Sequence, residues 1–322
     1  MWKIGNLEIS GKVVLAPMAG ITSVGYRTFM VPFGASICVT EMVSDMGLIY
    51  GNDETKEYLE FNDCGIPTGV QLFGFDPINF AKSAQIAQKM NNNIAFFDVN
   101  MGCPVPKVTK TGAGSSLMKN PKLCGDIIRE LKKVCSVPIT AKIRLGWDDK
   151  SVNFLEVISQ LEKAGVDAIA IHARTRAELY SGTPHYEMLK DLQERMNVPL
   201  IISGNIFSLE QAIEAMDITG ATALMVARGG MGNPFLIRQI DHYFRTGEKL
   251  SDPTIEQQKQ WCLELGEILT RSMGELRAMR IYRGIATKFF SGFPGAKAVK
   301  IKLATELTDL NSLKRILNSI QI

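Results

Sequence analysis

The sequence predicts an α/β fold, an eight-stranded (β/α)8 TIM barrel followed by a small C-terminal helical bundle. Eight short apolar runs recur along the first 240 residues, and segments with the spacing of amphipathic helices separate most of them. No strand pattern remains after about residue 243, where only helical segments follow. A doubly wound open sheet is the alternative, but no GxGxxG motif follows the first run, which reads APMAG.

The predicted strands alternate along the chain with the helices. In order they are KVVLAPM (12–18), ICVTEM (37–42), TGVQLFG (68–74), FFDVNMG (96–102), ITAKIRLG (139–146), AIAIHAR (168–174), LIISGNI (200–206) and ALMVARGG (223–230). Each run ends in polar or glycine residues. This is expected where the βα loops of a barrel build a site on its C-terminal rim.

Two of the helical segments carry signals at their ends. In 153–165 apolar residues recur at three- and four-residue steps, and Gly165 occupies the position of a helix C-cap glycine. In 208–220, Ser208 precedes the helix as N-cap and Gln211 follows three residues later, as in a capping box. These signals favour helices between the strands.

The segment KLSDPT (249–254) is the predicted linker between two domains. Residues 1–245 would form the catalytic barrel, and residues 246–322 would form a helical domain. The predicted helices of the second domain are 254–274, 275–292, 296–307 and 312–322.

Several classes of protein are excluded by composition. No run of about 18 uncharged apolar residues is present, so no membrane span is expected. The N-terminal segment lacks the apolar core of a signal peptide, so a cytoplasmic location is expected. The cysteines form no CxxC or CxH pair, so we expect no metal site, no disulfide framework and mostly buried packing thiols. They are Cys38, Cys64, Cys103, Cys124, Cys135 and Cys262.

Two glycine-bearing loops follow the seventh and eighth predicted strands. In barrels, phosphate commonly binds at the loops after these two strands. The first loop reads Ser203-Gly204-Asn205, and the second begins with Ala227 and Arg228 before a pair of glycines. Backbone amides and the Arg228 guanidinium would bind a phosphate there. The alternative is that the glycines only make a tight turn.

Three polar residues on the barrel strands indicate which ligand the phosphate belongs to. Lys142 alternates with apolar residues, and a lysine inside a barrel is costly without an anionic partner. It would lie beside flavin mononucleotide (FMN), whose reduced form is anionic, and His172 and Gln71 would contact the same cofactor. The alternatives are an ion pair of Lys142 with Asp98, and purely structural hydrogen bonds for the other two residues.

Cys103 lies in NMGCP, after the fourth strand and before the glycine-rich GAGSS loop (112–116). A thiol with an ordinary pKa near 8.5 is mostly protonated at pH 7. It can therefore donate a proton while flavin delivers hydride to the adjacent carbon of a polarised C=C bond. The alternative is a buried thiol with a packing role only.

Together these motifs resemble the tRNA-dihydrouridine synthases. The resemblance is carried, in order along essentially the whole barrel, by LAPMAGITS, EMVS, VQLFG, DVNMGCPVPKV with GAGSSLMKNP, AKIRLGW, HARTRAELYSG and MGNPF. The combination of NMGCP, KIRLGW and HARTR is highly specific. The C-terminal region is similar to the RNA-binding domain of this family, although its sequence is less diagnostic.

The resemblance implies reduction of the C5–C6 double bond of uridines in tRNA, with FMN as cofactor and NADPH as reductant. Cys103 would protonate the uracil C5 carbon, and Asn100 and Arg174 would contact the substrate. The residues expected to hold FMN are Pro17, Met18, Ala19, Gln71, Lys142, His172, Ser203, Gly204, Asn205, Ala227 and Arg228. The partner would be tRNA, and the protein is expected to be a monomer.

This chain departs from the family pattern at three places that bear on individual flavin hydrogen bonds. The family usually has Asn-Gly-Asp where this chain has Ser203-Gly204-Asn205, and often Gly-Arg where it has Ala227-Arg228. After the first strand, Thr-Asp of the family is Thr22-Ser23 here.

Positive charge is concentrated in the C-terminal region. The whole chain has a net charge of +3, but residues 244–322 hold 13 Lys/Arg against 8 Asp/Glu. Arg277, Arg280 and Lys288 are predicted near one face of a helix, where they would neutralise tRNA phosphates. The alternative for each single residue is an ordinary solvated helix face.

Two other functions compete with this one. A flavin reductase of a free pyrimidine, similar to dihydroorotate dehydrogenases, would share the barrel, FMN and the lysine but would not need a basic helical region. An RNA-binding module without catalysis is disfavoured because Cys103 and Lys142 are both present.

Overall fold

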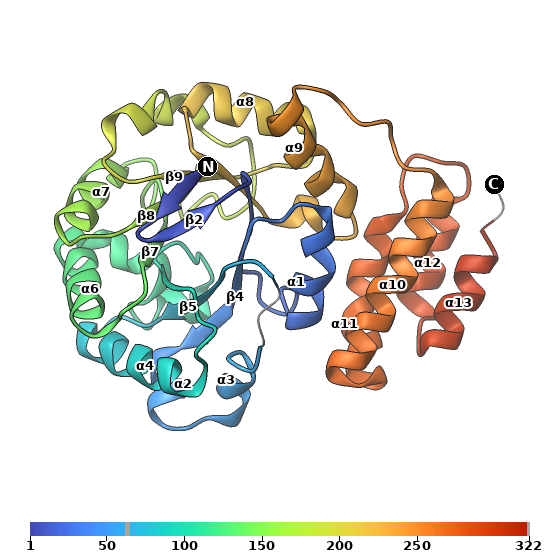
Figure 1. Cartoon of the computed structure of the whole chain (residues 1–322), viewed down its shortest axis with the longest axis horizontal. Helices are drawn as coiled ribbons and strands as arrows, with labels where there is room; N and C mark the ends of the chain where they lie inside the picture. The colour runs from blue at the N-terminus through green and yellow to red at the C-terminus, as the bar shows by residue number, and fades with distance from the viewer. Residues whose placement is uncertain (62–64, 321–322) are drawn as a thin grey trace.

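The computed structural model describes residues 1–61 and 65–320, which form a closed parallel barrel with a helical bundle beside it (Figure 1). The strands pair in the ring order β10-β3-β4-β5-β6-β7-β8-β9. Their bounds are β3 (Val13–Leu15), β4 (Ile37–Ser44), β5 (Thr68–Phe73), β6 (Phe96–Asn100), β7 (Ile139–Arg144), β8 (Ala168–His172), β9 (Leu200–Ser203) and β10 (Ala223–Val226). Each predicted strand overlaps one of these, so the predicted TIM barrel is confirmed.

Helices surround the barrel on its outside. They are α1 (Val24–Met30), α2 (Asp45–Ile49), α3 (Asp53–Glu57), α4 (Pro77–Met90), α5 (Pro106–Thr109), α6 (Pro121–Val134), α7 (Phe154–Lys163), α8 (Leu209–Thr219) and α9 (Pro234–Thr246). Short 3₁₀ turns are η1 (Val31–Phe33), η2 (Gly114–Lys119), η3 (Tyr186–Leu189), η4 (Leu192–Arg195) and η5 (Arg228–Gly230). Only η3 and η4 stand between β8 and β9, where a regular barrel would have a helix.

The predicted helix ends are largely present. Gly165, two residues beyond α7, has φ +86°, a left-handed conformation that glycine adopts without steric cost. Ser208 accepts a hydrogen bond from the backbone N–H of Gln211 (3.3 Å). The Gln211 side chain accepts instead from the N–H of Phe207 (2.9 Å), so only one half of the predicted capping box forms.

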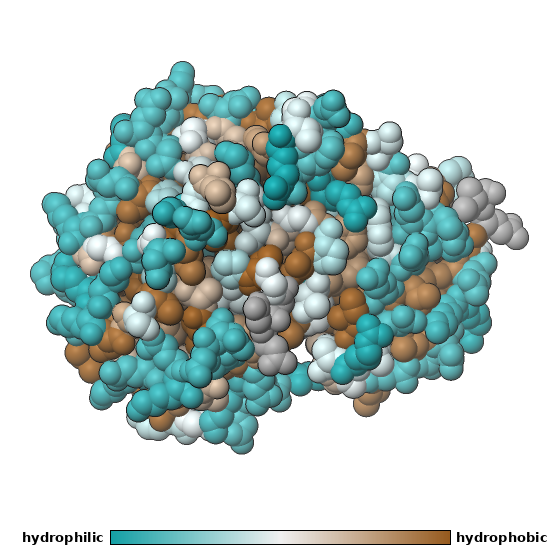
Figure 2. Space-filling model, in the orientation of Figure 1, coloured by the Kyte–Doolittle hydropathy of each residue, from teal (hydrophilic) through white to brown (hydrophobic). Residues whose placement is uncertain are grey.

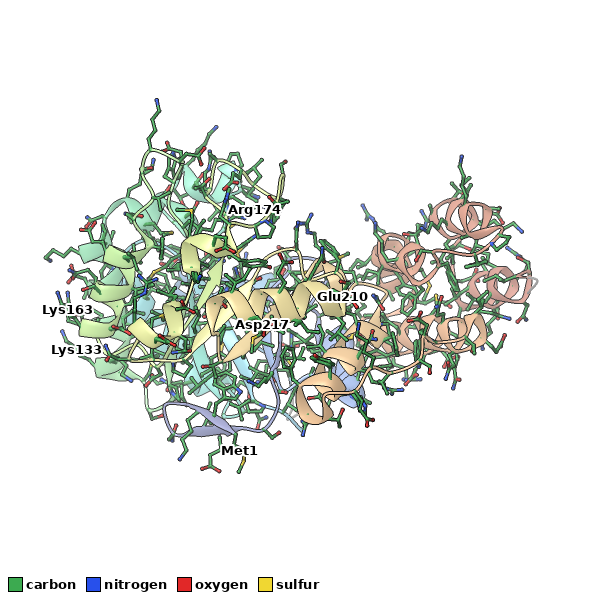
Figure 3. All side chains as sticks on the ribbon, turned by 90° about the horizontal axis from the view of Figure 1, so that it is seen from above. Met1, Lys133, Lys163, Arg174, Glu210 and Asp217 are labelled. Carbon is green, nitrogen blue, oxygen red and sulfur yellow. The ribbon has the colours of Figure 1, made fainter. Side chains whose placement is uncertain are left out.

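An N-terminal hairpin, which the strand pattern did not predict, covers the end of the barrel at which the strands begin. It consists of β1 (Trp2–Ile4) and β2 (Leu7–Ile9), paired antiparallel. Ile4 and Ile9 are almost fully buried and join the apolar cluster inside the barrel. Figure 3 places Met1 and Arg174 at opposite ends of the barrel, so the hairpin closes the end remote from the strand C-termini.

The C-terminal bundle has four helices in the described part of the chain. They are α10 (Ile255–Met273), α11 (Glu275–Ala286), α12 (Ala296–Thr305) and α13 (Leu310–Asn318), with the 3₁₀ turn η6 (Thr287–Phe289) between α11 and α12. The prediction of one helix over 275–292 is wrong in its last part, because the chain turns at η6. Lys288 therefore lies on this turn and not on the helix that carries Arg277 and Arg280.

The bundle packs against the barrel through α1, η1 and α9. The rings of Phe33 and Trp261 meet edge to face at 5.3 Å, and the Arg238 guanidinium lies 4.8 Å from the Phe33 ring centroid. At the other end of the contact, Arg277 pairs with Glu57 of α3 (2.9 Å). The apolar centre of this contact holds the two parts of the molecule together.

On the face that Figure 2 shows, hydrophilic side chains dominate the outline and apolar side chains are exposed in groups between them. No helix in the described part of the chain is both long and apolar enough to cross a membrane. Within residues 1–61 and 65–320, no group of His, Cys, Asp and Glu is arranged to hold a metal ion. All cysteines in these ranges are buried except Cys135, which is half-buried. Cys64 lies outside the described residues.

Candidate active site

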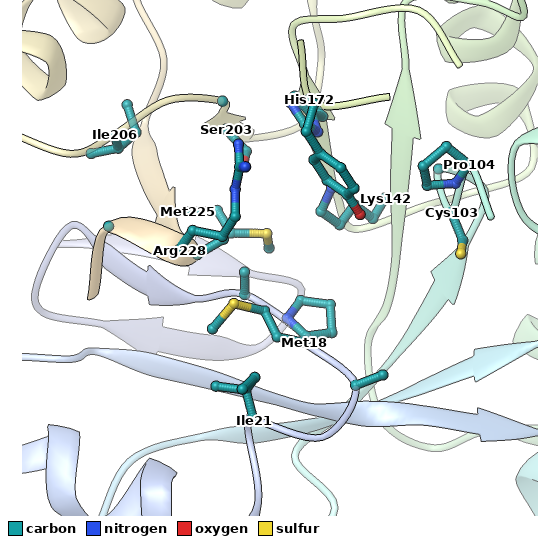
Figure 4. Close-up of a pocket in the computed structure, with 18 of the residues that line it drawn as sticks. Met18, Ile21, Cys103, Pro104, Lys142, His172, Ser203, Ile206, Met225 and Arg228 are labelled. Carbon is teal, nitrogen blue, oxygen red and sulfur yellow. The ribbon is translucent and has the colours of Figure 1, made fainter. Parts of the chain in front are cut away.

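A cavity of about 390 Å³ opens at the C-terminal ends of the barrel strands (Figure 4). Most residues predicted for the site line it together. They are Pro17, Met18, Ala19, Asn100, Cys103, Lys142, His172, Ser203, Gly204, Asn205, Ala227 and Arg228. The parallel strands place these residues at one rim, although they are separated by more than two hundred positions in the sequence.

The cavity is positively charged. Lys142, Arg144 and Arg228 line it, and none of its described lining residues is Asp or Glu. No ion pair to any of these three cations is present among the described residues. A concave wall with uncompensated cations is suited to an anionic ligand.

Lys142 has neither an ion pair nor a hydrogen bond to a described residue, so the alternative of an ion pair with Asp98 is not what the structure contains. Burial and the nearby charge of Arg144 lower the pKa of Lys142 to about 8. Asp98 opposes this shift only through its more distant charge. At pH 7 the amine is still protonated, and its charge is available to a ligand.

His172 is held as a neutral imidazole. Burial lowers its pKa well below 6.5, and the surrounding cations lower it further. The Arg174 guanidinium lies 3.1 Å from His172 Nε2. Because a guanidinium can only donate hydrogen bonds, Nε2 must be the acceptor, and the ring proton is on Nδ1.

Arg174 does not line the cavity and is fully buried. Besides His172, its guanidinium donates to the carbonyls of Ser181 (2.8 Å) and Gly182 (2.5 Å). Its contacts therefore hold the loop after β8. This placement gives no support to the predicted direct contact of Arg174 with substrate.

Cys103 is fixed by hydrogen bonds to its backbone from two directions. Its N–H donates to Asn100 Oδ1 (2.9 Å), and its carbonyl accepts from the hydroxyl (2.9 Å) and the N–H (3.1 Å) of Ser115. Gly114 has φ +61°, and a Cβ there would lie 2.8 Å from the Cys103 carbonyl oxygen. The GAGSS loop therefore needs glycine at this position in order to approach NMGCP closely.

The Cys103 thiol is a weak acid in this setting. Burial raises its pKa, while the Val105 N–H and the charges of Arg144 and Lys142 act in the opposite direction. The net effect is an increase, so the thiol keeps its proton at neutral pH. A thiol that is protonated and yet lines a cavity can act as a proton donor.

Gln71, which is predicted to contact flavin, is fully buried and is not among the residues that line the cavity, so that contact stays a prediction. Its Nε2 donates to Asp98 Oδ2 (2.6 Å), and its Oε1 accepts from Asn100 Nδ2 (2.8 Å). Thr140 donates to the other oxygen of Asp98 (2.6 Å). Asp98, Gln71, Asn100 and Cys103 thus form one continuous chain of hydrogen bonds, which we call the Asp98 chain.

The Asp98 chain fixes the orientation of two amides. The Gln71 amino group donates to Asp98, so the Gln71 oxygen faces Asn100 and accepts from its amide nitrogen. The Asn100 oxygen is then left to accept from the N–H of Cys103. Sequence spacing places these residues on adjacent strands but carries no signal for their pairing.

The two predicted phosphate loops pack against each other through their backbones. Gly204 has φ +128°, and a Cβ on Gly229 would lie 1.8 Å from the carbonyl oxygen of Ile206. The Tyr186 hydroxyl donates to the carbonyl of Gly204. Glycine is therefore required at both positions, and the loops form a narrow backbone cradle beside Arg228.

Sequence reasoning missed the aromatic part of the wall. Tyr180, which is half-exposed, lies 4.9 Å from the Arg228 guanidinium and 5.5 Å from that of Arg144. Phe207 contacts Arg228 at 5.5 Å. Tyr180 belongs to the HARTRAELYSG motif, but only the irregular β8–β9 connection turns it toward the cavity.

The basic residues predicted for RNA binding lie on the bundle, and one of them, Lys288, is next to this rim. Arg277, Arg280 and Lys288 are all exposed. The backbone around Lys288 touches the loop after β10, because a Cβ on Gly232 would lie 2.7 Å from Lys288 Cβ. Met231, beside Gly232, lines the cavity. The bundle therefore adjoins the cavity at the β10 loop.

Known proteins with similar sequences match most of this chain. A family model described as "Dihydrouridine synthase (Dus)" matches residues 14–321. The chain is 35% identical to a probable tRNA-dihydrouridine synthase of Rickettsia bellii over 297 residues, which cover 92% of this chain and 90% of that protein. It is 34% identical to tRNA-dihydrouridine synthase B of Shewanella oneidensis over 281 residues, 87% of each chain.

Solved structures share the fold at low sequence identity. The old yellow enzyme homologue from Zymomonas mobilis superposes with a TM-score of 0.52 at 12% identity, covering 77% of this chain and 92% of that one. A complex of 2-naphthoyl-CoA reductase with 2-naphthoyl-CoA superposes with a TM-score of 0.57 at 12% identity, covering 74% of this chain and 51% of that one.

Proposed function

The chain belongs to the dihydrouridine synthase family, and from that premise we propose that it reduces the C5–C6 double bond of uridines in tRNA. FMN would be its cofactor, and NADPH would re-reduce it. The observation that carries the proposal is the position of Cys103, a protonated thiol in the wall of a cavity that has several cations and no described carboxylate.

The residues present fit FMN. The cavity volume of about 390 Å³ lies within the range of roughly 300–1,000 Å³ typical of small-molecule sites. The backbone cradle and Arg228 suit a phosphate, and the unpaired Lys142 suits the anionic edge of a flavin ring. The other residues that we assign to this cofactor are Pro17, Met18, Ala19, His172, Ser203, Gly204, Asn205 and Ala227.

Bound FMN would supply the hydride that reaches C6 of the uracil. Cys103 would give its S–H proton to C5, so that the ring gains one hydride and one proton, and the thiolate then recovers a proton from water. Because burial raises the pKa of Cys103, the thiol carries the proton that this step needs at neutral pH. Lys142, still protonated at pH 7, would stabilise negative charge on the cofactor.

Asn100 has one donor that a substrate can use. Its Nδ2 donates to Gln71 Oε1 and also to Met42 Sδ (2.9 Å). A thioether is a weak acceptor, so a uracil carbonyl would replace it with a net gain. Met42 lines the cavity and can move aside.

The bundle supports tRNA as the substrate. Lys288 adjoins the β10 loop of the cavity, and Arg277 and Arg280 are exposed on α11. These residues would bind phosphates of the RNA that delivers the nucleotide. The target uridine has to leave its stack to reach the cavity, which costs least in loops and single strands.

The test combines cofactor content, product and a matched pair of cysteine variants. Purified protein should contain FMN, and with NADPH it should form dihydrouridine in unmodified tRNA, as measured by mass spectrometry. Cys103→Ala should lower the rate of uridine reduction by roughly 10²–10⁴-fold and leave reduction of FMN by NADPH near normal. The control is Cys135→Ala, on the outside of the barrel.

Each competing function predicts a different result. Reduction of free uracil or uridine at the rate seen with tRNA would favour the free-pyrimidine reductase. Binding of tRNA without flavin absorbance, and without recovery after FMN is added, would favour the non-catalytic module. Either result would contradict the proposal.

A further inference from the structure

A second group of cations lies beside the cavity and has no role in the site described above. The Lys119 amine lies 3.3 Å from the ring centroid of Trp147, and the Arg176 guanidinium lies 4.4 Å from the same centroid. We call Lys119, Trp147 and Arg176 the Trp147 cluster. Trp147 belongs to KIRLGW and Arg176 to HARTR, so two of the sequence motifs meet here.

The Trp147 cluster is attached to the loops that form the cavity wall. Arg176 donates its backbone N–H to the carbonyl of Gly146 (2.9 Å), two residues from the lining residue Arg144. Met118, next to Lys119, accepts a hydrogen bond at its sulfur from the N–H of Arg144 (3.3 Å). The cluster therefore has a fixed position relative to the cavity.

The cations of the cluster have no acidic partners. In residues 1–61 and 65–320, neither Lys119 nor Arg176 forms an ion pair, and Arg176 Nε is buried without a hydrogen-bond partner. Each cation is attracted to the negative face of the ring, while the two repel each other. Trp147 thus holds two positive charges in place, where an anion could bridge them.

The surface continues toward Cys103. Lys107 and Lys110 belong to α5 and its C-cap, a few residues after Cys103, and both are exposed without an ion pair among the described residues. α5 packs against η2, which ends at Lys119.

The ring order of the barrel places the Trp147 cluster across the cavity from the bundle. The cluster comes from the loops after β6, β7 and β8, whereas the bundle meets the barrel at α1, after β3, and at the β10 loop. In the ring, β6 is four places from β10, and β7 is four places from β3. A polyanion that covers the cavity mouth would therefore meet positive charge on both sides.

We propose that the Trp147 cluster binds phosphates of the same RNA that delivers the uridine, on the side of the cavity opposite the bundle. This inference rests on the proposed function, because it needs an RNA substrate. A free nucleotide would not reach both surfaces, whereas an RNA strand that passes over the cavity would be bound at its two ends and positioned with its uridine between them.

The experiment compares two double variants that remove the same charge. Lys119→Ala/Arg176→Ala removes the cations of the cluster, and Lys163→Ala/Arg195→Ala removes one lysine and one arginine that are exposed elsewhere on the barrel. Lys163 ends α7 and lies away from both Arg174 and the bundle (Figure 3). FMN content and the melting temperature establish that each variant is folded.

The cluster variant should raise the Kd for unmodified tRNA by roughly tenfold at about 0.1 M salt. It should also reduce the slope of log K against log[salt] by roughly one unit for each phosphate that the variant no longer neutralises. Its KM for tRNA should rise with little change in kcat. The control variant should match the wild type in all of these quantities.

Three results would overturn the inference. An unchanged Kd and salt slope in the cluster variant, with a wild type that forms dihydrouridine, would exclude the surface and leave the proposed function intact. Loss of FMN from the cluster variant would show a structural role instead. A wild-type protein that forms no dihydrouridine in any tRNA would refute the proposed function, and the inference with it.

Discussion

Gln71→Met tests the hydrogen bonds that support the site. Methionine has nearly the same length and volume as glutamine, so the change removes the amide without opening a large cavity. It leaves the Asp98 carboxylate with Thr140 as its side-chain donor, and it leaves Asn100 with Met42 sulfur as its acceptor. A buried polar group deprived of its partner costs about 1–3 kcal/mol, so the expected loss of unfolding free energy is about 2–6 kcal/mol.

Urea denaturation measures this loss. If m is about 3 kcal/mol per M, the midpoint should fall by about 0.7–2 M without a change in m. The matched control is Gln85→Met on the exposed face of α4, which should stay within about 0.5 kcal/mol of the wild type. A decrease in unfolding free energy below about 0.5 kcal/mol in Gln71→Met would refute the Asp98 chain.

The pH dependence sharpens this test. Burial already raises the pKa of Asp98, and the Gln71 hydrogen bond opposes that shift. Without Gln71 the pKa of folded Asp98 rises further. The pKa of Asp98 in the unfolded chain is near 3.8, and its pKa in the folded protein is higher. The folded protein therefore loses stability as the pH rises from the first pKa through the second, because folding opposes release of this proton. The deficit of Gln71→Met should therefore be larger at pH 7 than at pH 4, and a deficit of constant size would contradict the assignment.

Three further predictions concern titration and charge. Because the pKa of folded His172 is lowered, the unfolded state takes up its proton first, so stability should fall as pH drops below about 6.5. In His172→Asn this fall, followed by urea denaturation, should be shallower by up to about 1.4 kcal/mol per pH unit, and an identical slope would contradict the assignment. Alkylation of Cys103 by iodoacetamide, corrected with Cys103→Ala, should reach half its maximal rate above pH 9.0, because burial raises the thiol pKa. A plateau below pH 8 would argue against a protonated thiol. Changing Arg277, Arg280 and Lys288 to Ala should weaken tRNA binding and flatten its salt dependence by roughly one unit for each phosphate left without its cation, with FMN content unchanged. Equal affinity and an equal salt slope would show that these residues do not bind the RNA.

The barrel was predictable because its strands are buried on both faces and appear as continuous apolar runs. The hairpin was missed because its two strands, of three residues each, lie in the mixed polar segment MWKIGNLEISGK, which contains no continuous apolar run. The end of α11 was missed for a different reason. No proline or glycine separates Ala286 from Lys288, so the turn at η6 depends on packing against the β10 loop.

The candidate site was predictable in its residues but not in their pairing. Alternation along β5 and β6 places Gln71 and Asp98 toward the barrel axis, and Gln71 was expected to bond to flavin there as one of the polar residues at the strand ends. Their side chains bond to each other instead, because Asp98 is buried and needs donors. For Arg174, the deciding contacts are loop carbonyls that no sequence pattern marks.

Closure of the barrel has a consequence for synthesis of the chain. β3 pairs with β10, which follows it by roughly 210 residues in the sequence. β3 therefore lacks this neighbour until β10 has been synthesised. At about 5–20 residues per second, translation of that stretch takes roughly 10–40 seconds. The β1–β2 hairpin is local and can form within about 1–10 μs of leaving the ribosome. Throughout the remaining interval the nascent chain carries an apolar β3 with one unpaired edge, which is open to pairing with the wrong strand.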